Sequence, residues 1–475
     1  MQHDSQERYT RIFVILLLLA GFVLSAGLSE ARKVTGTVCC GDERLSGVLV
    51  TDGTSFTTTS PAGRYTIDVA DSAAFVYVIT PSGYTVDCSS GTPVFYRKLG
   101  AAKRYDFSLV KDREGGDYTL LCISDPQCRN KKQFAQFCAE PLRDICSQVE
   151  RYAPEGIVAG LMLGDIGWDS FKVVNPLFKK TMPQVPAPMY PVIGNHDFDM
   201  GRQGREARRS YEDDFGPVNY AFWLGEDLVV VLKNIIYDTQ KKYVEGYTDE
   251  EFTFMKGLLE HIPADTHLYV AQHSPLHGWF RSTPIVRGEE MVALLDGRRV
   301  DFVSGHTHIS NNYAHTPTIR EHNPAALCGA WWLTTWDNDG TPRGYRIFRK
   351  RDGVLDWWYH PVDYDDDFQF ELILPGHSIL HPASLLANVW DYDEAWSVVW
   401  YQDGEPKGPM EQVRDVSPTY VRQISEVYEG KAIPGFRRPR QNIHYFSAVP
   451  DKEAREIRVV VTNRFGKSWE QTVRL

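Results

Sequence analysis

The chain has 475 residues, of which 43% are hydrophobic and 24% are charged. At roughly 150 residues per domain, this length predicts about three domains, and the composition excludes a disordered chain. The net charge of -11 argues against a nucleic-acid duplex as partner, because affinity for its phosphates comes largely from Lys and Arg. The 8 Cys are too few for a disulfide scaffold and leave local bridges and buried free thiols both open.

The N-terminus has the order of a secretory signal. Arg8 and Arg11 precede an apolar run from Ile12 to Leu28, and small residues follow the run. We therefore expect residues 1–31 to be a signal peptide and the protein to be exported, to the periplasm or outside the cell. The run is also close to the shortest length that spans a membrane. An uncleaved anchor is the alternative, and it is the only membrane contact that we expect.

Residues 32–111 carry short β-like segments separated by Gly, Pro, Ser and Asp, which is typical of strands joined by turns. The segments are KVTGTV, SGVLVTDG, GRYTIDV, AFVYVIT and YDFSLV. We expect a small antiparallel β-sandwich, followed by a polar, Gly-containing linker that ends near Asp117.

From residue 117 to 345, apolar segments alternate with helical patterns, which is the signature of an α/β domain. The predicted strands are YTLLCIS, IVAGLML, MYPVIG, LVVVLKN, HLYVAQ and VDFVSG, and the predicted helices are FAQFCAEPLRDICSQVERY and TDEEFTFMKGLLEHI. Every predicted strand except LVVVLKN ends in residues that can bind a metal: SDPQ, GD, GNHD, QHSP and GHTH. Residues 346–475 are β-like again, so we expect a third, β-rich domain.

The polar residues after these strands should lie together, because open α/β sheets bind ligands in the crevice at the carboxyl ends of their strands. Carboxylate, amide and imidazole groups without thiolate suit Mn, Fe or Zn. His306 and His308 alternate along an extended segment, so both can reach one site. Glycine precedes three of the clusters, where a turning backbone needs a positive φ or a close approach: Gly164, Gly194 and Gly305.

The ordered set D-x-Q, GD, GNHD, H and GHTH, between Tyr118 and about Trp336, resembles the calcineurin-like metallophosphoesterases. The resemblance implies a β-sandwich core flanked by helices in α-β-β-α layers, with two divalent metal ions. It implies that Asp125, Gln127, Asp165 and His308 hold one ion, and that Asp165, Asn195, His273 and His306 hold the other. It also implies that His196 faces the substrate and that Asp197 orients its ring.

The flanking regions carry weaker resemblances. SGVLVTDG and SPAGRYTI in the first domain are similar to transthyretin-like or carboxypeptidase-regulatory-like modules. The whole arrangement, with a β-rich tail that ends in VTNRFGKSWEQTV, resembles secreted phosphoesterases with dedicated N- and C-terminal domains. Neither resemblance names a substrate.

Gln127 departs from the family pattern, since most members have His there and an amide oxygen is a weaker donor than imidazole. D-P-Q also occurs in branches similar to diphosphatases of nucleotide-linked alcohols or sugars. Our leading hypothesis is hydrolysis of small-molecule phosphomonoesters by a hydroxide that bridges the two metals. The alternatives are a phosphodiesterase or diphosphatase acting on nucleotide-linked sugars or alcohols, and a catalytically silent module that binds glycan or protein.

Four residues near the clusters are candidate substrate contacts: Arg202, Arg205, His277 and Trp279. Arg can grip a phosphate through two parallel hydrogen bonds, and Trp can stack on a ring. The alternatives are a solvated helix face for the two Arg and core packing for Trp279. GFRRPRQ, residues 435–441, is interpreted as an exposed basic patch. The sequence does not indicate an oligomeric state.

Overall fold

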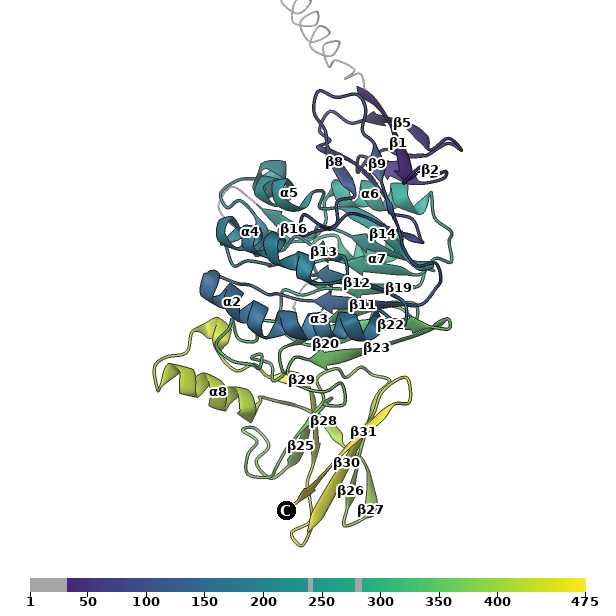
Figure 1. Ribbon diagram of the computed structural model, residues 1–475. Helices are drawn as coiled ribbons and strands as arrows, with labels where there is room; N and C mark the ends of the chain where they lie inside the picture. The colour runs from purple at the N-terminus through teal and green to yellow at the C-terminus, as the bar shows by residue number, and fades with distance from the viewer. Residues whose placement is uncertain (1–31, 238–241, 278–283) are drawn as a thin grey trace, which may run out of the picture.

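The computed structural model describes residues 32–237, 242–277 and 284–475, which form three parts stacked along one axis (Figure 1). The predicted signal peptide lies outside the described residues. Within the described ranges, no helix is both long enough and apolar enough to cross a membrane.

The first part consists of short strands. One sheet contains β1 (Arg32–Cys40), β2 (Glu43–Arg44), β5 (Arg64–Val69) and β9 (Phe107–Ser108), and a second contains β3 (Leu49–Thr51), β4 (Phe56–Thr58), β6 (Phe75–Val78) and β8 (Tyr96–Lys98). β7 (Tyr84–Thr85) pairs with β10 (Val110–Lys111). The predicted N-terminal β-domain is confirmed. It is joined to the next part where the N–H of Trp223 donates to the carbonyl of Thr80, at 2.9 Å.

Two sheets that face each other form the core. The first has the order β13-β12-β11-β22-β23, from β11 (Tyr118–Ile123), β12 (Ile157–Met162), β13 (Met189–Pro191), β22 (Gly344–Arg351) and β23 (Val354–Pro361). The second has the order β14-β15-β18-β19-β21-β20, from β14 (Tyr220–Leu224), β15 (Asp227–Val231), β18 (Leu268–Ala271), β19 (Val300–Val303), β20 (Asn311–Ala314) and β21 (Ile319–Asn323). Every residue of β11 is buried, as expected for a strand covered on both faces.

Helices cover the outer faces of this sandwich. α2 (Lys131–Ala139), α3 (Pro141–Tyr152), α4 (Phe171–Thr181) and α5 (Arg209–Phe215) share a hydrophobic core with the first sheet, and α6 (Asp249–Leu259) and α7 (Gly288–Leu294) with the second. The predicted α-β-β-α layers are confirmed. The continuous helical pattern predicted over residues 134–152 is instead two helices. The break comes at Glu140, because Pro141 takes the first position of α3, where its missing N–H costs nothing.

β22 and β23 complete the core sheet, and β22 pairs antiparallel with β11. The core therefore continues past residue 345, where the sequence placed the end of the domain. The place of these two strands in the core escaped prediction because β22 lies more than two hundred residues from its partner β11 along the chain.

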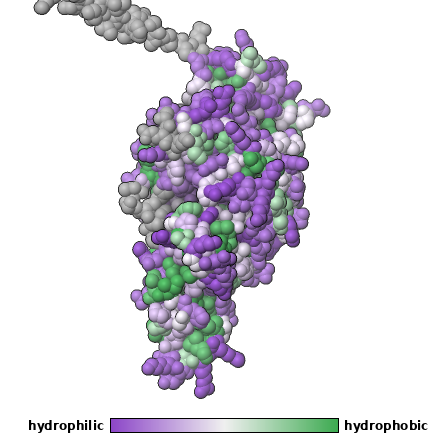
Figure 2. Space-filling model, turned by 90° about the vertical axis from the view of Figure 1, so that its left-hand side faces the viewer, coloured by the Kyte–Doolittle hydropathy of each residue, from purple (hydrophilic) through white to green (hydrophobic). Residues whose placement is uncertain are grey.

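The third part is a β-sandwich with one helix. One sheet contains β24 (Glu371–Ile373), β25 (Leu385–Asn388), β28 (Glu411–Asp415) and β29 (Asn442–Ala448), and the other β26 (Ser397–Gln402), β27 (Glu405–Pro409), β30 (Glu456–Thr462) and β31 (Ser468–Arg474). The unpredicted helix is α8 (Pro418–Tyr428). A fully buried ion pair between Arg346 and Asp391 joins this part to the core. Figure 2 shows that hydrophobic side chains gather on the lower half of one side of the molecule.

All eight Cys lie in the described ranges, and all are free thiols. Cys122, Cys128 and Cys328 are buried, and the other five are partly exposed. Of the two alternatives left open by the sequence, the structure has the free thiols.

Candidate metal centre

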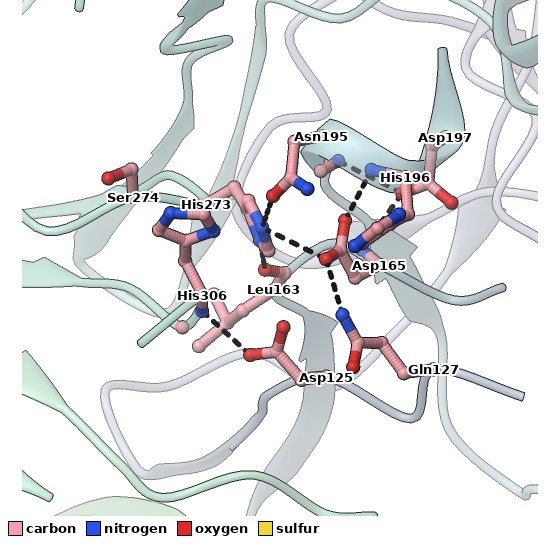
Figure 3. A network of polar contacts seen from close by, with 12 residues as sticks. Asp125, Gln127, Leu163, Asp165, Asn195, His196, Asp197, His273, Ser274 and His306 are labelled. Carbon is pink, nitrogen blue, oxygen red and sulfur yellow. Dashed lines mark hydrogen bonds and ion pairs between the residues drawn. The ribbon is translucent and has the colours of Figure 1, made fainter. Parts of the chain in front are cut away.

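The loops after five core strands converge at one place between the two sheets (Figure 3). β11, β12 and β13 are parallel neighbours in the first sheet, as β18 and β19 are in the second. Their carboxyl ends carry the seven predicted ligands: Asp125 and Gln127, Asp165, Asn195, His273, His306 and His308.

Asp165 is the centre of the contacts among these side chains. Its Oδ2 atom lies 2.8 Å from Nε2 of Gln127 and 3.4 Å from Nε2 of His273. Nε2 of His273 also lies 2.9 Å from Oδ1 of Asn195. Asp165, His273 and His306 each offer a ligand atom, and these atoms all lie within 4.8 Å of one another. The geometry therefore supports Asp165 as a ligand shared between two sites.

Asp125 connects the last loop to this cluster. Its Oδ2 atom accepts from the backbone N–H of His306 at 2.7 Å, and its Oδ1 atom lies 3.6 Å from Nε2 of His308. Asp125 is completely buried and His308 is 3% exposed, so the pair is shielded from solvent. The two predicted ligand sets therefore adjoin each other, since Asp125 of the first set contacts His306 of the second.

Five of the predicted ligands have a left-handed backbone. φ lies between 38° and 72° at Asp125, Gln127, Asp165, His306 and His308. Such a conformation costs on the order of 1–3 kcal/mol per residue and persists only where the surrounding structure enforces it. At Gly164, φ is 92° and a Cβ would lie 2.3 Å from Nδ1 of His273, so only glycine fits. This concentration of strain at the strand ends indicates a functional site.

The cluster also contains buried polar atoms that make no hydrogen bond within the described part of the chain: Oδ1 of Asp125, Oε1 of Gln127, Oδ1 of Asp197 and Nδ1 of His308. A buried polar atom without a partner is costly, and a ligand bound in the cluster would provide a partner for these atoms. Burial disfavours the charged form of Asp165, yet the imidazoles of His273 and His196 lower its pKa and keep the carboxylate ionised. Anionic oxygen, amide oxygen and imidazole together fit divalent cations.

His196 lies in the short turn η2 (Asn195–Asp197), beside Asp165. Its backbone N–H donates to Oδ1 of Asp165 at 2.8 Å. Its Nδ1 atom lies 2.7 Å from Oδ1 of Asp169, so Asp169 is the carboxylate that orients the ring. The predicted orienting role of Asp197 is therefore wrong. Asp197 instead accepts from the backbone N–H groups of Gly194 and Asp165, at 2.9 and 2.8 Å, because the turn directs its side chain back toward its own start.

Sequence reasoning missed two carboxylates of this site. Asp169 follows Asp165 by four residues in the same loop, and this spacing was the available signal. Glu245 ends β17 (Tyr243–Glu245), which pairs with β16 (Ile235–Tyr237), and its Oε1 atom lies 2.7 Å from Nε2 of His306. No local pattern marks Glu245, because it reaches the site only through the hairpin.

The three predicted substrate contacts that lie within the described residues, Arg202, Arg205 and His277, make their contacts outside this cluster. Arg202 pairs with Glu206 at 3.3 Å, and Arg205 pairs with Glu212 at 3.0 Å. His277 stacks on Tyr313, with ring centroids 3.7 Å apart, and lines a separate cavity of about 410 Å³. Trp279 lies outside the described residues. The two Arg are engaged by neighbouring carboxylates, which agrees with the alternative of a solvated face.

Three family models match the chain in series. The model for the N-terminal domain of calcineurin-like phosphoesterases matches residues 32–112, the calcineurin-like phosphoesterase model matches residues 118–310, and the model for the C-terminal domain matches residues 321–469. The chain thus belongs to the calcineurin-like phosphoesterases and is a metal-dependent phosphoester hydrolase, with flanking domains on both sides of the catalytic one. This assignment argues against the catalytically silent binding module.

Several solved structures are similar to this chain. A dimetal phosphatase from Danio rerio is 12% identical, with 51% of this chain and 95% of that chain covered and a TM-score of 0.35. A phosphopantetheinyl hydrolase from Mycobacterium tuberculosis is 13% identical, with coverages of 45% and 91% and a TM-score of 0.29. A 5'-nucleotidase from Candida albicans is 11% identical, with 52% of each chain covered and a TM-score of 0.32. No curated protein matches the sequence.

Proposed function

We propose that this chain is an exported, binuclear metal-dependent phosphoesterase that hydrolyses phosphomonoesters of small molecules. The observation that carries the proposal is the buried cluster around Asp165, in which ligands from five loops converge, five of the seven ligands have a strained backbone, and several polar atoms lack partners. Export rests on the sequence of residues 1–31, and the likeness of the first domain to transthyretin-like modules rests on its sequence alone.

The chain offers two adjoining sets of ligands. Asp125, Gln127, Asp165 and His308 would hold one divalent cation, and Asp165, Asn195, His273 and His306 would hold the other. When bound, the cations supply positive charge that neutralises the phosphoryl oxygens and lowers the pKa of the attacking water. The strained backbone fixes the ligand atoms in advance, so that little order must be gained on binding.

His196 would act on the leaving group. Asp169 holds Nδ1 of the ring, which leaves Nε2 to donate a proton to the leaving oxygen. Burial lowers the pKa of His196, but the nearby carboxylates of Asp165 and Asp169 raise it above its ordinary value. The contact with the Asp169 carboxylate favours the protonated ring that a proton donor needs.

Hydrolysis of p-nitrophenyl phosphate by protein reconstituted with Mn, Fe or Zn tests the proposal. We expect metal-dependent release of p-nitrophenol, which Asp165→Ala abolishes and His196→Ala strongly reduces. Arg202→Ala is the matched control, because Arg202 pairs with Glu206 away from the cluster. Undiminished activity in both variants of the cluster would overturn the proposal.

Cleavage of a phosphodiester or pyrophosphate in nucleotide-linked sugars or alcohols is the second candidate. It is favoured by two indole rings beside the cluster: Trp168 lies 5.6 Å from the ring of His196, and Trp331 stacks on His308 at 4.6 Å. Parallel assays with nucleotide sugars, CDP-alcohols and simple monoesters separate the two candidates. A higher kcat/KM for simple monoesters would eliminate the second.

A further inference from the structure

The segment GFRRPRQ is largely exposed, as the sequence suggested, and one of its residues, Phe436, packs against two indoles that border the metal centre. The short turn η4 (Gly435–Arg437) follows α8 in the C-terminal domain, and the ring of Phe436 meets two core indoles edge-on. Its centroid lies 6.1 Å from that of Trp168 and 5.0 Å from that of Trp331. Trp168 and Trp331 are themselves 5.9 Å apart. We call these three side chains the aromatic wall.

The aromatic wall borders the catalytic side chains directly. Trp331 stacks on His308, and Trp168 lies next to His196, the proposed proton donor. The wall therefore stands on the side where a leaving group would depart. Phe436 is 42% exposed, so its ring keeps a free face for a ligand.

Two guanidinium groups flank the aromatic wall without a carboxylate partner within the described residues. Arg129 lies over the ring of Trp168, with its Cζ atom 3.8 Å from the centroid. Arg437 lies 4.9 Å from the ring of Phe436, and its only polar side-chain contact among the described residues is the hydroxyl of Tyr428, at 3.0 Å. Most other Arg residues near the core, such as Arg208 and Arg346, form ion pairs. Unpaired guanidinium beside an exposed ring fits an anionic group attached to a planar one.

The wall is held in place by the fold. Nδ2 of Asn338 donates to the carbonyl of Phe436 at 3.0 Å, and the hydroxyl of Tyr420 donates to the carbonyl of Arg437 at 2.7 Å. Trp331 and Trp332 have φ of 54° and 65°, which is rare for bulky residues. Nε1 of Trp332 donates to the carbonyl of Pro126, which ties this strained turn to the metal-binding loop. If Trp331 and Trp332 only packed in the core, no function would offset the free-energy cost of their strained backbone. The strain therefore points to a functional role for this turn.

We propose that the C-terminal domain completes the substrate site, and that the aromatic wall with Arg129 and Arg437 binds phosphate esters whose leaving group carries a planar aromatic ring and a second anionic group. This inference rests on the proposed function and assigns its substrate class. The rings supply stacking, and the guanidinium groups bind the second anion while the first phosphate lies at the metal centre.

Three probes separate the contribution of the ring to recognition from that of the second anion. Adenosine 3′,5′-bisphosphate has both features, fructose 1,6-bisphosphate has only the second phosphate, and glycerol 2-phosphate has neither. Wild-type protein should have the highest kcat/KM with the first. Phe436→Leu should lower kcat/KM about threefold to tenfold for the adenosine compound alone, mainly through KM. Arg437→Gln should lower it about tenfold or more for both bisphosphates and leave glycerol 2-phosphate unchanged.

Arg440→Gln is the matched control, because Arg440 belongs to the same exposed segment and is expected to leave all three probes unaffected. A loss in Phe436→Leu that is equal for all three probes, or no loss at all, would overturn the assignment. If none of the probes is hydrolysed, that result counts against the proposed function. Calorimetric titration with the two bisphosphates then still tests the assignment of the aromatic wall. Tighter binding of the adenosine compound that Phe436→Leu removes supports the aromatic wall, and equal binding of both overturns it.

Discussion

Two buried clusters of Asp and His in the described core differ in backbone conformation and in how far their hydrogen bonds are completed. Around Asp301, the charges satisfy one another: Oδ2 lies 2.7 Å from Nε2 of His267, and Oδ1 lies 2.9 Å from Nε2 of His322. His267 in turn faces Asp227, which also accepts from Tyr118 at 2.6 Å. None of these five residues has a positive φ or an unpartnered side-chain polar atom.

The cluster around Asp165 has the same residue types but a strained backbone and unpartnered atoms. The comparison teaches that burying Asp with His does not itself make a metal centre. The cluster around Asp301 completes its hydrogen bonds within the protein, whereas the cluster around Asp165 keeps some of them open.

The largest expected effect is a difference between variants of the two central carboxylates, Asp301 and Asp165, in stability and in activity. Asp301→Asn should lower the free energy of unfolding by about 3–5 kcal/mol, because it breaks a buried charge network. Asp165→Asn should abolish activity and cost less stability than Asp301→Asn, since Asn tolerates a left-handed backbone and can still accept from the N–H of His196, although its amide nitrogen cannot accept from Nε2 of Gln127. Denaturant unfolding and hydrolysis of p-nitrophenyl phosphate per folded molecule measure the two effects. The distinction fails if Asp165→Asn unfolds the protein as much as Asp301→Asn does.

A second prediction sharpens the description of the functional cluster itself. His196→Ala should lower kcat by about two to four orders of magnitude if the ring donates a proton. Asp169→Asn should cause a smaller loss, because the ring remains but loses its charged partner. Asp199→Asn is the control, since this carboxylate of the following loop accepts from Ser210 at 2.7 Å. Equal kcat values for the Asp169 and Asp199 variants would remove Asp169 from the site.

These two clusters also show how far the sequence leads. The loops of Asp125 and Asp165 were predictable because neighbouring parallel strands of one sheet present their carboxyl ends at one edge. His273 follows β18 of the second sheet, and its convergence with them was implied by the family resemblance. Glu245 and Phe436 were not predictable, because each reaches the site through long-range packing that leaves no local pattern. The predicted role of Asp197 in orienting the ring of His196 was wrong for a related reason. The two residues are neighbours in sequence, but the turn geometry directs the carboxylate of Asp197 to backbone N–H groups.

A third prediction concerns another cluster that satisfies itself. His360 is 2% exposed, with Nδ1 2.7 Å from Asp366 and Nε2 3.0 Å from Asp144 of α3. Burial lowers its pKa, but the two carboxylates outweigh burial and raise it from 6.5 to about 9. Its stabilisation should therefore be complete below the pKa of the unfolded chain, near 6.5, and should be lost as pH rises through about 9.

His360→Gln should accordingly cost up to about 3 kcal/mol of unfolding free energy at pH 6 and much less at pH 10. The exposed His377→Gln is the control, and its effect should be small at both values. Urea unfolding at the two pH values measures the difference. A cost for His360→Gln that does not change with pH would show that packing, and not charge, gives His360 its role.

The smallest expected effect concerns the one amide among the ligands of the first set. Nε2 of Gln127 donates to Asp165 at 2.8 Å, which leaves Oε1 as the atom without a partner. Gln127→His should bind a divalent cation about tenfold more tightly, or about 1.4 kcal/mol, because imidazole is the better donor for Mn, Fe or Zn. His also tolerates the left-handed backbone at this position, where φ is 38°. Gln127→Leu should bind the cation more weakly than wild type, since it removes the oxygen altogether. Calorimetric titration with Mn²⁺ ranks the three proteins, and identical affinities would mean that the open hydrogen-bonding position at residue 127 does not serve a metal.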